Sequence, residues 1–532
     1  MRGGARYTLA RDRSPFISCL DTPLLQLSPS DPFTLRDACN GVHCWGAIGS
    51  GKTSGPGKAL AGAYLRAGMG GIWLCAKPDE VELALSYARA NGRLHDVIIF
   101  GEGKGFDPLS WELGRQGMQG IGAVVDCLMR ILEAADHASG AAAKPSEEIW
   151  RQLVRQFIAH AVPLLYAAWG RVTIADIVAF VTSAAKTKEQ YTDQAFIGAS
   201  LAARTLGQVM KAPAVPLPDA QSFIDYFIYE YTAIPDKMRG SGVASLAAKL
   251  DRFKFGRMKS LFCGATTIVP EMCFHGAIII LNMPVLTWND DGVIAQCLFK
   301  YCFERAVEAR NGLHPSQRER PVFEFADEGH YFLTPSSEAF LSTCRGARCC
   351  VVYMSQTLPT YYARIGQDQS AAADGLVGKF NTQIFCLNSC IKTNEYASKL
   401  IGRDVTWRRT KGASYGTNNS RGMNEGANAN KGNSSNHGSS TGGQSSSWNH
   451  SSGDSSGSGT SWGGNVGKGT SAGESWSEAE NMDNLIEPRF FANNLKSGGP
   501  RHGNLVTAIW FKAGAAFEEA DGSNWLTVTF RQ

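Results

Sequence analysis

The sequence lacks long apolar stretches and an export signal. No run of about 18 apolar residues, the minimum for a helix that crosses a bilayer, occurs in its 532 residues. The N-terminus starts basic but continues with Asp12 and Pro15 where a signal peptide would have an apolar segment. We therefore expect a cytoplasmic protein without an intrinsic membrane span, in which any attachment to a membrane would be made through partners.

Zinc-type cysteine spacing and a strong charge bias are also missing. The 14 cysteines form no CxxC pair, and most lie in apolar runs, as Cys349 and Cys350 do. This pattern predicts buried, reduced thiols and argues against a zinc site. The net charge of +4 gives no case for coating nucleic acid along the whole chain, but it leaves a local basic lining open.

What the sequence does contain is a phosphate-binding loop. Residues 46–53 read G-A-I-G-S-G-K-T and match the pattern G-x-x-x-x-G-K-[ST]. Its glycines let backbone N–H groups face phosphates, its lysine contacts the β/γ oxygens, and its hydroxyl can ligate Mg²⁺. The loop predicts ATP and Mg²⁺ binding, with a plain glycine-rich turn as the alternative. The expected nucleotide-binding residues are Gly46, Gly49, Ser50, Gly51, Lys52, Thr53 and Ser54, with Thr53 on the metal.

Short apolar runs around the loop alternate with helical patterns. Expected strands at 42–45, 70–75 and 97–100 are separated by helices after residues 58 and 77, which gives the β-α-β-α-β order of a doubly wound sheet. From about residue 116 to 255 the periodicity is helical almost throughout, so we expect an all-α insertion. Strand patterns return at 278–282, 322–326, 349–354 and 382–388, and again at 505–510 and 525–530.

One segment changes composition sharply. From residue 412 to about 480 the chain consists mainly of Gly, Ser and Asn, and such a segment buries too little apolar surface to offset its ordering entropy, which predicts disorder. The expected organisation is an N-terminal segment 1–40, a nucleotide-binding domain formed by 41–115 and 260–411, an all-α insertion 116–259, the disordered segment 412–480 and a C-terminal segment 481–532.

Polar residues at the ends of two strands are candidates for the chemistry. Asp327 and Glu328 follow an apolar strand, so we expect them at the edge of the sheet beside the phosphate loop, with Asp327 on Mg²⁺ and Glu328 polarising the attacking water. Gln356 ends the next strand and can contact the γ-phosphate or its water. The alternatives are a helix N-cap pair for the two acids and a turn residue for the glutamine.

Two arginines precede the strand that ends at Gln356. Arg345 or Arg348, delivered from a neighbouring subunit, would stabilise the charge of a phosphoryl-transfer transition state if the protein forms rings. The alternative is an ordinary surface arginine.

Taken in order, these motifs resemble the type IV secretion coupling proteins, the TraG/TraD-like conjugative DNA-transfer ATPases of the FtsK/HerA-like ring translocases. The resemblance covers roughly residues 42–410, and the tail after 485 matches more loosely. Its blocks are 46–53, 106–109, 278–284, 325–328 with His330 and Phe332, 355–356, 381–382 and 396–402.

The resemblance implies a RecA-like core, a homo-hexamer, and ATP hydrolysis between subunits. It also implies delivery of single-stranded DNA, or of a relaxase or effector protein, to type IV secretion channel components. Lys52, Glu328 and Gln356 would then be catalytic. In the family an arginine stands eleven residues before the sensor glutamine, which favours Arg345 over Arg348.

The chain departs from the family in four places. Transmembrane helices are missing, Cys75 and Ala76 precede Lys77 where an aspartate is common, Glu324 interrupts the apolar run before the acids, and the Gly/Ser-rich segment interrupts a compact region. A substrate receptor with nucleotide-controlled docking therefore stays open beside the translocase. A P-loop kinase is a more distant alternative, because the Asp-Glu pair and the late glutamine argue against it.

Overall fold

The computed structural model describes residues 14–101, 103–139, 148–334, 337–365, 370–422, 431–442, 445–456 and 465–532. These residues belong to two compact units. The first consists of Met1–Asn394 with Arg489–Gln532, and the second of Glu395–Pro488.

A nine-stranded sheet forms the centre of the first unit, in the order β15-β14-β9-β3-β8-β7-β4-β6-β5. The strands from β9 to β5 pair in parallel, and β14 and β15 add an antiparallel edge. The strand that precedes the phosphate loop therefore lies inside the sheet. The bounds are β3 (Val42–Trp45), β4 (Gly70–Leu74), β5 (Val97–Phe100), β6 (Ile278–Leu281), β7 (Val322–Ala326), β8 (Cys349–Ser355), β9 (Thr382–Phe385), β14 (Leu505–Lys512) and β15 (Trp525–Arg531).

Helices cover both faces of this sheet, as the continuous apolar runs of its strands require. Successive side chains of a strand point to opposite faces. On one face Trp73 stacks on Phe325, with ring centroids 4.2 Å apart, in a core shared with α2 and α3. On the other face Phe299 of α15 packs against Phe100 and Phe106. The expected α/β fold of the RecA-like type is confirmed. The helices are α2 (Lys58–Arg66), α3 (Asp79–Ala90) and α15 (Asp290–Ala309).

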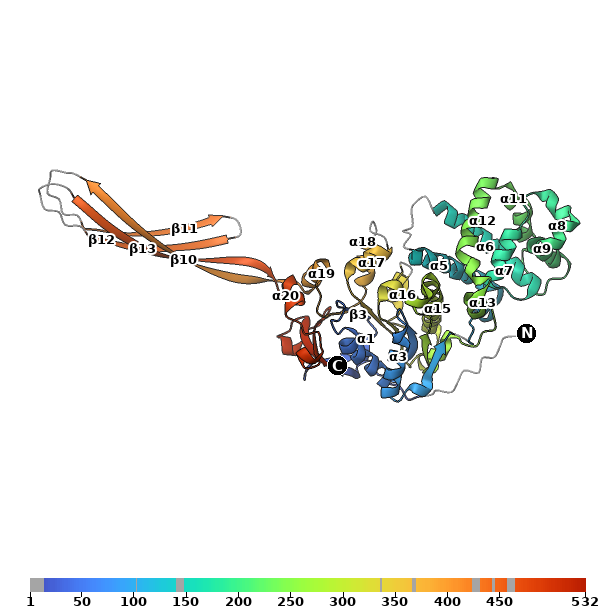
Figure 1. The fold of residues 1–532 in the computed structure, drawn as a ribbon, viewed down its shortest axis with the longest axis horizontal. Helices are drawn as coiled ribbons and strands as arrows, with labels where there is room; N and C mark the ends of the chain where they lie inside the picture. Colours follow the sequence, from blue (N-terminus) through green and yellow to red (C-terminus); the bar gives the residue numbers. More distant parts are fainter. Residues whose placement is uncertain are drawn as a thin grey trace. The chain divides into compact units, whose positions relative to one another are not determined.

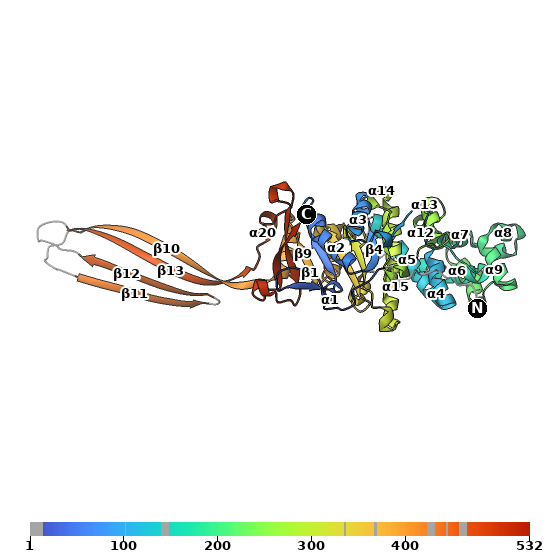
Figure 2. The same cartoon turned by 90° about the horizontal axis from the view of Figure 1, so that it is seen from below.

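The insertion is helical, as the periodicity predicts. It follows β5 in the chain, and in Figures 1 and 2 its helices lie toward the β5 side of the sheet, with β14 and β15 at the opposite side. The helical region begins ahead of the predicted boundary at residue 116, with α4. There Asp107 accepts hydrogen bonds from the backbone of Leu109 and Ser110, an N-cap with proline at the first position. The helices are α4 (Pro108–Gln116), α5 (Ile121–Ser139), α6 (Glu148–Trp169), α7 (Ile174–Ser183), α8 (Gln194–Ala199), α9 (Leu201–Lys211), α10 (Ala220–Asp225), α11 (Tyr231–Ala233), α12 (Asp236–Leu250) and α13 (Gly256–Phe262).

Smaller elements complete the first unit. A two-stranded sheet near the N-terminus pairs β1 with β2 in antiparallel fashion. The remaining elements are β1 (Pro23–Gln26), β2 (Pro32–Thr34), α1 (Leu35–Ala38), α14 (Val285–Trp288), α16 (Ser337–Thr343), α17 (Leu358–Ile365), α18 (Ser370–Val377) and, at the junctions of the two units, α19 (Ile391–Ile401) and α20 (Pro488–Asn493).

The second unit departs from the expected disorder of 412–480. β10 (Arg403–Gly422) pairs in antiparallel register with β13 (Asn465–Asn484), and β11 (Lys431–Gly442) pairs with β12 (Ser445–Ser456). Figure 1 shows the two ladders as long ribbons. Their hydrogen bonds join main-chain groups, which every residue type here supplies, so a ladder needs no apolar composition. The expected disorder also included 423–430, 443–444 and 457–464, which lie outside the described residues.

Within the described residues, no single helix is long and apolar enough to cross a membrane. Two helices, Ile149–Trp169 and Ile174–Ser183, reach the required length and hydropathy only as a pair, and they are bent by 109° relative to each other.

Candidate nucleotide site

The phosphate loop lies at the carboxyl edge of the sheet, where β3 ends. Two backbone hydrogen bonds hold its start, from Gly46 N to Ser355 O at 3.1 Å and from Ala47 N to Leu387 O at 3.0 Å. The chain then enters a π-helical turn at Thr53–Gly57 that continues into α2. This strand–loop–helix arrangement leaves backbone N–H groups at a helix start without helical partners, which suits phosphate binding.

The C-terminal strands pack directly against this loop, a contact that the sequence did not reveal. A Cβ atom on Gly51 would lie 2.4 Å from Val506 of β14, and Gly51 has a φ of 84°. Both facts exclude a larger residue there. Gln532 Nε2 donates to Ser54 Oγ at 2.6 Å. The antiparallel edge thus supports the start of the helix that follows the loop.

The two acids after β7 meet the loop residues. Lys52 Nζ lies 3.4 Å from Asp327 Oδ1 and 3.3 Å from Glu328 Oε1, and all three side chains are buried. Thr53 Oγ1 donates to Asp327 Oδ2 at 2.7 Å. A hydroxyl and a carboxylate side by side are oxygen ligands of the kind Mg²⁺ prefers, so these two residues fit the expected metal.

Glu328 has one oxygen held and one oxygen unpartnered. Its Oε1 accepts hydrogen bonds from Lys52 Nζ at 3.3 Å, Lys77 Nζ at 3.2 Å and Gln356 Nε2 at 3.1 Å. Its Oε2 is buried and has no hydrogen-bond partner among the described residues. The Glu328 backbone is left-handed, with φ 53° and ψ 47°, a conformation that costs a non-glycine residue roughly 1–2 kcal/mol and is common where a side chain is aimed at a site.

The electrostatics of the site keep both Glu328 and Lys52 charged. Burial works to raise the pKa of Glu328, but Lys52, Gln356 and Lys77 outweigh it and hold that pKa below its usual value. Burial likewise works to lower the pKa of Lys52, and the two acids outweigh it and raise that pKa. Glu328 is therefore a carboxylate at neutral pH, the form that can accept a proton.

His330 is a neighbour of Glu328 that sequence reasoning named in a motif but gave no role. Its Nδ1 lies 3.8 Å from Glu328 Oε2 and 3.3 Å from Ser355 Oγ, and its carbonyl accepts a hydrogen bond from His137 Nε2 of α5 at 3.2 Å. Burial lowers the pKa of His330 to about 4. The ring is therefore neutral and does not form a salt bridge that would weaken Glu328 as a base.

Lys77 is a second residue without a predicted role. It follows β4 and contacts Glu328 Oε1, and its own pKa is raised because Asp327, Glu328 and Glu80 outweigh its burial. The sequence signal was the lysine after the second strand of the core, which the family pattern also contains.

Glu324, which interrupts the apolar run of β7, is explained by a buried network. Tyr353 donates a hydrogen bond to Glu324 Oε1, and Lys300 Nζ lies 3.8 Å from the same oxygen. Lys300 also contacts Glu304 at 2.7 Å and donates to Ser337 Oγ at 2.9 Å. The acid therefore joins β7 to α15 and α16 without facing the nucleotide site.

The two candidate arginines differ in their surroundings, and neither lies at the carboxyl edge. Arg345 is exposed at the amino end of β8, and no ion pair or side-chain hydrogen bond joins it to another described residue. Arg348 donates to the backbone oxygens of Ser18 at 2.8 Å and Glu319 at 2.9 Å. The seven residues of β8 separate Arg345 from Gln356 by roughly 20 Å, so Arg345 does not reach the site on the same chain.

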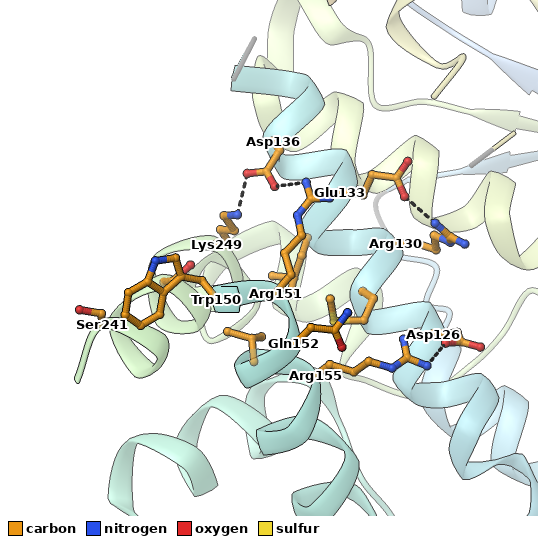
Figure 3. A pocket seen from close by; sticks show the side chains of 14 residues that line it. Asp126, Arg130, Glu133, Asp136, Trp150, Arg151, Gln152, Arg155, Ser241 and Lys249 are labelled. Atoms are coloured by element: carbon orange, nitrogen blue, oxygen red, sulfur yellow. Dashed lines mark hydrogen bonds and ion pairs between the residues drawn. The ribbon is translucent and has the colours of Figure 1, made fainter. Parts of the chain in front are cut away.

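A separate cavity of about 610 Å³ lies in the helical insertion, between α5, α6 and α12. Figure 3 shows its charged lining, in which Asp136 pairs with Arg151 and with Lys249. Arg155 pairs with Asp126 at 2.7 Å, and Arg130 with Glu133 at 2.8 Å. None of the predicted nucleotide-site residues lines this cavity.

Comparisons with known proteins agree with the geometry. Residues 321–461 match the family described as "TraM recognition site of TraD and TraG". No curated protein matches the sequence. The family match at residues 321–461 begins one residue before β7, so it includes Asp327, Glu328 and Gln356.

Three solved structures of one protein share the fold. The bacterial conjugative coupling protein TrwBdeltaN70 in an unbound form superposes with a TM-score of 0.53 at 13% identity, covering 96% of this chain and 90% of that one. TrwB with the non-hydrolysable ATP analogue ADPNP superposes with a TM-score of 0.53 at 13% identity, covering 100% of this chain and 92% of that one. TrwB with ADP and Mg²⁺ superposes with a TM-score of 0.52 at 13% identity, covering 94% of this chain and 87% of that one. The resemblance to TraG/TraD-like coupling proteins is thus confirmed in the fold and in the matched segment.

Proposed function

We propose that this protein is an ATP-hydrolysing ring translocase that couples a DNA or protein substrate to a type IV secretion or conjugation channel. One observation carries the proposal. At the carboxyl edge of the sheet, Glu328 is fixed through one oxygen by Lys52, Lys77 and Gln356, while its other oxygen is buried and unpartnered. A fixed, ionised carboxylate with one unused oxygen is what a base acting on a water molecule requires.

Each residue of the site then has a distinct task. Lys52 and the loop backbone bind the β/γ-phosphates, and Glu328 Oε2 accepts the proton of the attacking water. Gln356, which donates to Glu328 at 3.1 Å, orients that carboxylate and would respond to the γ-phosphate or to its water. Bound Mg²⁺, held through Thr53 and Asp327, would neutralise charge on the phosphates.

The position of Arg345 supports a homo-hexameric ring. A transition state gains stabilisation from a cation near its equatorial oxygens, and this chain offers no arginine for that task among the predicted residues at its own carboxyl edge. A head-to-tail contact between subunits would bring the exposed Arg345 of one copy to the site of the next, and such contacts close into rings.

The partners follow from the relatives. The family name of residues 321–461 refers to recognition of TraM by TraD and TraG, and TrwB is a conjugative coupling protein. We propose that this chain likewise meets a relaxosome or an effector protein, acts on single-stranded DNA, and works in the cytoplasm at the inner membrane through channel components.

A substrate receptor with little pumping activity is the second candidate. The observation that favours it is the charged cavity in the helical insertion (Figure 3), whose ion pairs are partly exposed and can exchange for groups of a docking protein. Capture of a relaxase or effector by the full chain tests this reading. The variant reverses the charge of Arg155 by Arg155→Asp, and the control adds Asp126→Arg, which restores an ion pair of opposite orientation.

ATP hydrolysis by the purified full chain tests the main proposal. We expect turnover that single-stranded DNA stimulates and that Lys52→Ala and Glu328→Gln each lower strongly, at least about a hundredfold for Glu328→Gln. We also expect six-fold rings in electron micrographs with ATP and DNA. Turnover that is equal in all three proteins would contradict it.

A further inference from the structure

We propose that a depression lined by Phe255, Arg257 and Trp288 binds a short segment of single-stranded nucleic acid. The inference rests on the proposed function, because it places the DNA of that function on named residues. The depression has a volume of about 240 Å³ and lies where the start of α13 meets α14. It is smaller than the roughly 300–1,000 Å³ of sites that enclose a small molecule, so it suits one portion of a longer polymer.

The backbone holds an aromatic ring outside the core. Phe255 is extended, with φ −149° and ψ 173°, and Gly256 follows with a φ of 62° that favours glycine. The preceding Phe253 and the following Met258 are buried, whereas Phe255 is 64% exposed. An apolar ring in this position keeps most of its surface in water, so it adds little to the core and is available to a ligand.

A cation and a second ring complete the surface. The Arg257 guanidinium lies 4.8 Å from the centroid of the half-buried Trp288 ring. Successive bases of a single strand stack on aromatic rings and on guanidinium planes, and this stacking is tolerant of sequence because every base has a flat face. Phe255, Trp288 and Arg257 supply those surfaces within one depression.

The charge around the depression suits a phosphate backbone. The segment from Asp251 to Lys259 contains four basic residues and one acidic residue, and the acids Asp290 and Asp291 follow Trp288. Arg257 and Lys259 are exposed, and among the described residues neither pairs with a carboxylate. Arg252 and Lys254 pair with Asp291 and Asp251, respectively, at the surface, and such partly exposed pairs exchange for phosphate at little cost.

A short path joins this depression to the nucleotide site. Leu286 N, on the helix that carries Trp288, donates to Ala76 O at 3.0 Å. The next residue, Lys77, donates to Glu328 Oε1 at 3.2 Å. Bound DNA that moves α14 would therefore move Ala76, the residue next to Lys77. Because Lys77 is a charge partner of Glu328, the predicted base, this contact gives DNA a physical route to stimulate hydrolysis.

Fluorescence anisotropy with a labelled oligothymidylate and the full chain, without nucleotide, tests the proposal. We expect Phe255→Ala and Trp288→Ala each to weaken binding about tenfold, and Arg257→Ala to weaken it and flatten its salt dependence. The matched control is Tyr229→Ala. The Tyr229 ring is 52% exposed and also has a cation over it, Lys188 at 4.7 Å from the ring centroid. We expect its removal to leave the affinity for the oligonucleotide unchanged.

The outcomes separate this inference from the proposed function. Unchanged affinity in Phe255→Ala and Trp288→Ala overturns it, as does a wild-type chain that binds no oligonucleotide. A change in oligomeric state without a change in affinity also overturns it and assigns the patch to a protein contact. Phe255→Ala decides alone if Trp288→Ala does not fold. Because binding is measured without nucleotide, a wild type that fails to hydrolyse ATP refutes the proposed function while this result stands.

Discussion

At the carboxyl edge of the sheet Lys52 and Gln356 both donate hydrogen bonds to Glu328, whereas at the amino edge Arg345 is exposed. The first group is buried and held by several contacts, and the second residue has the freedom of a surface side chain. One copy of this chain therefore holds the proposed base, the proposed phosphate-binding lysine and the proposed sensor together, and its candidate arginine lies away from them. A site that needs both edges requires two copies.

The largest expected effect concerns the amino edge. Arg345→Ala should lower kcat by about a thousandfold, the low end for a trans-acting arginine, without changing the affinity for a non-hydrolysable ATP analogue. Arg348→Ala is the matched control. It removes two bonds to backbone oxygens and should lower Tm while kcat persists. Steady-state kinetics and thermal unfolding check both, and the reverse pattern would assign the trans role to Arg348.

The carboxyl edge should respond next. Glu328→Gln keeps the size of the side chain and removes the base, so we expect kcat to fall at least about a hundredfold, within the range for loss of general-base catalysis. Nucleotide affinity should remain, because Lys52 and the loop are intact. Isothermal titration with the analogue and single-turnover hydrolysis measure the two effects. A variant that hydrolyses ATP normally would remove Glu328 from the mechanism.

His330 should have a smaller effect through its position beside Glu328 Oε2. We expect His330→Ala to lower kcat on the order of tenfold by opening space beside that oxygen, which gives the carboxylate more freedom, with KM nearly constant. His330→Asn places an amide nitrogen where Nδ1 stands and should restore part of the rate, and His330→Gln should not. If the Asn and Ala variants lose equal activity and equal Tm, the histidine serves packing alone.

The smallest effect is a shift in pH dependence. Lys77 is one of the cations that hold the pKa of Glu328 below its usual value. Lys77→Met should therefore raise that pKa, so the acidic limb of the kcat/KM profile moves to higher pH and activity is lost sooner as pH falls. Lys77→Arg keeps the charge and should keep the limb in place. An unmoved limb in Lys77→Met would mean that another group titrates there.

Much of the core could be predicted because its signals are local. Most of the parallel strands are short, largely apolar runs bounded by turn residues, and residues 97–100 form β5 as the sequence predicts. The glycines and Lys52 of the loop, and the acids after β7, follow a spacing that phosphate chemistry dictates. Residues at strand ends share one edge of a parallel sheet, which is why Asp327 and Glu328 meet Lys52 and why Gln356 meets Glu328.

The remaining features depend on contacts between distant residues. Val506 packs on Gly51 because β14 joins the sheet beside β9, and no period in the sequence reveals that neighbour. His137 supports the His330 carbonyl from a helix nearly two hundred residues earlier in the chain. The ladders of β10 to β13 rest on main-chain hydrogen bonds, so a composition argument about apolar burial missed them.

Mixing two inactive variants tests most directly whether the site spans two copies. Arg345→Ala keeps its own base and Glu328→Gln keeps its arginine, so an Arg345→Ala subunit beside a Glu328→Gln subunit forms a complete site. In an equimolar, randomly assembled ring about a quarter of the head-to-tail contacts are complete. We expect ATP hydrolysis in the mixture to rise far above that of either variant. A mixture no more active than the two variants measured separately would contradict a shared site.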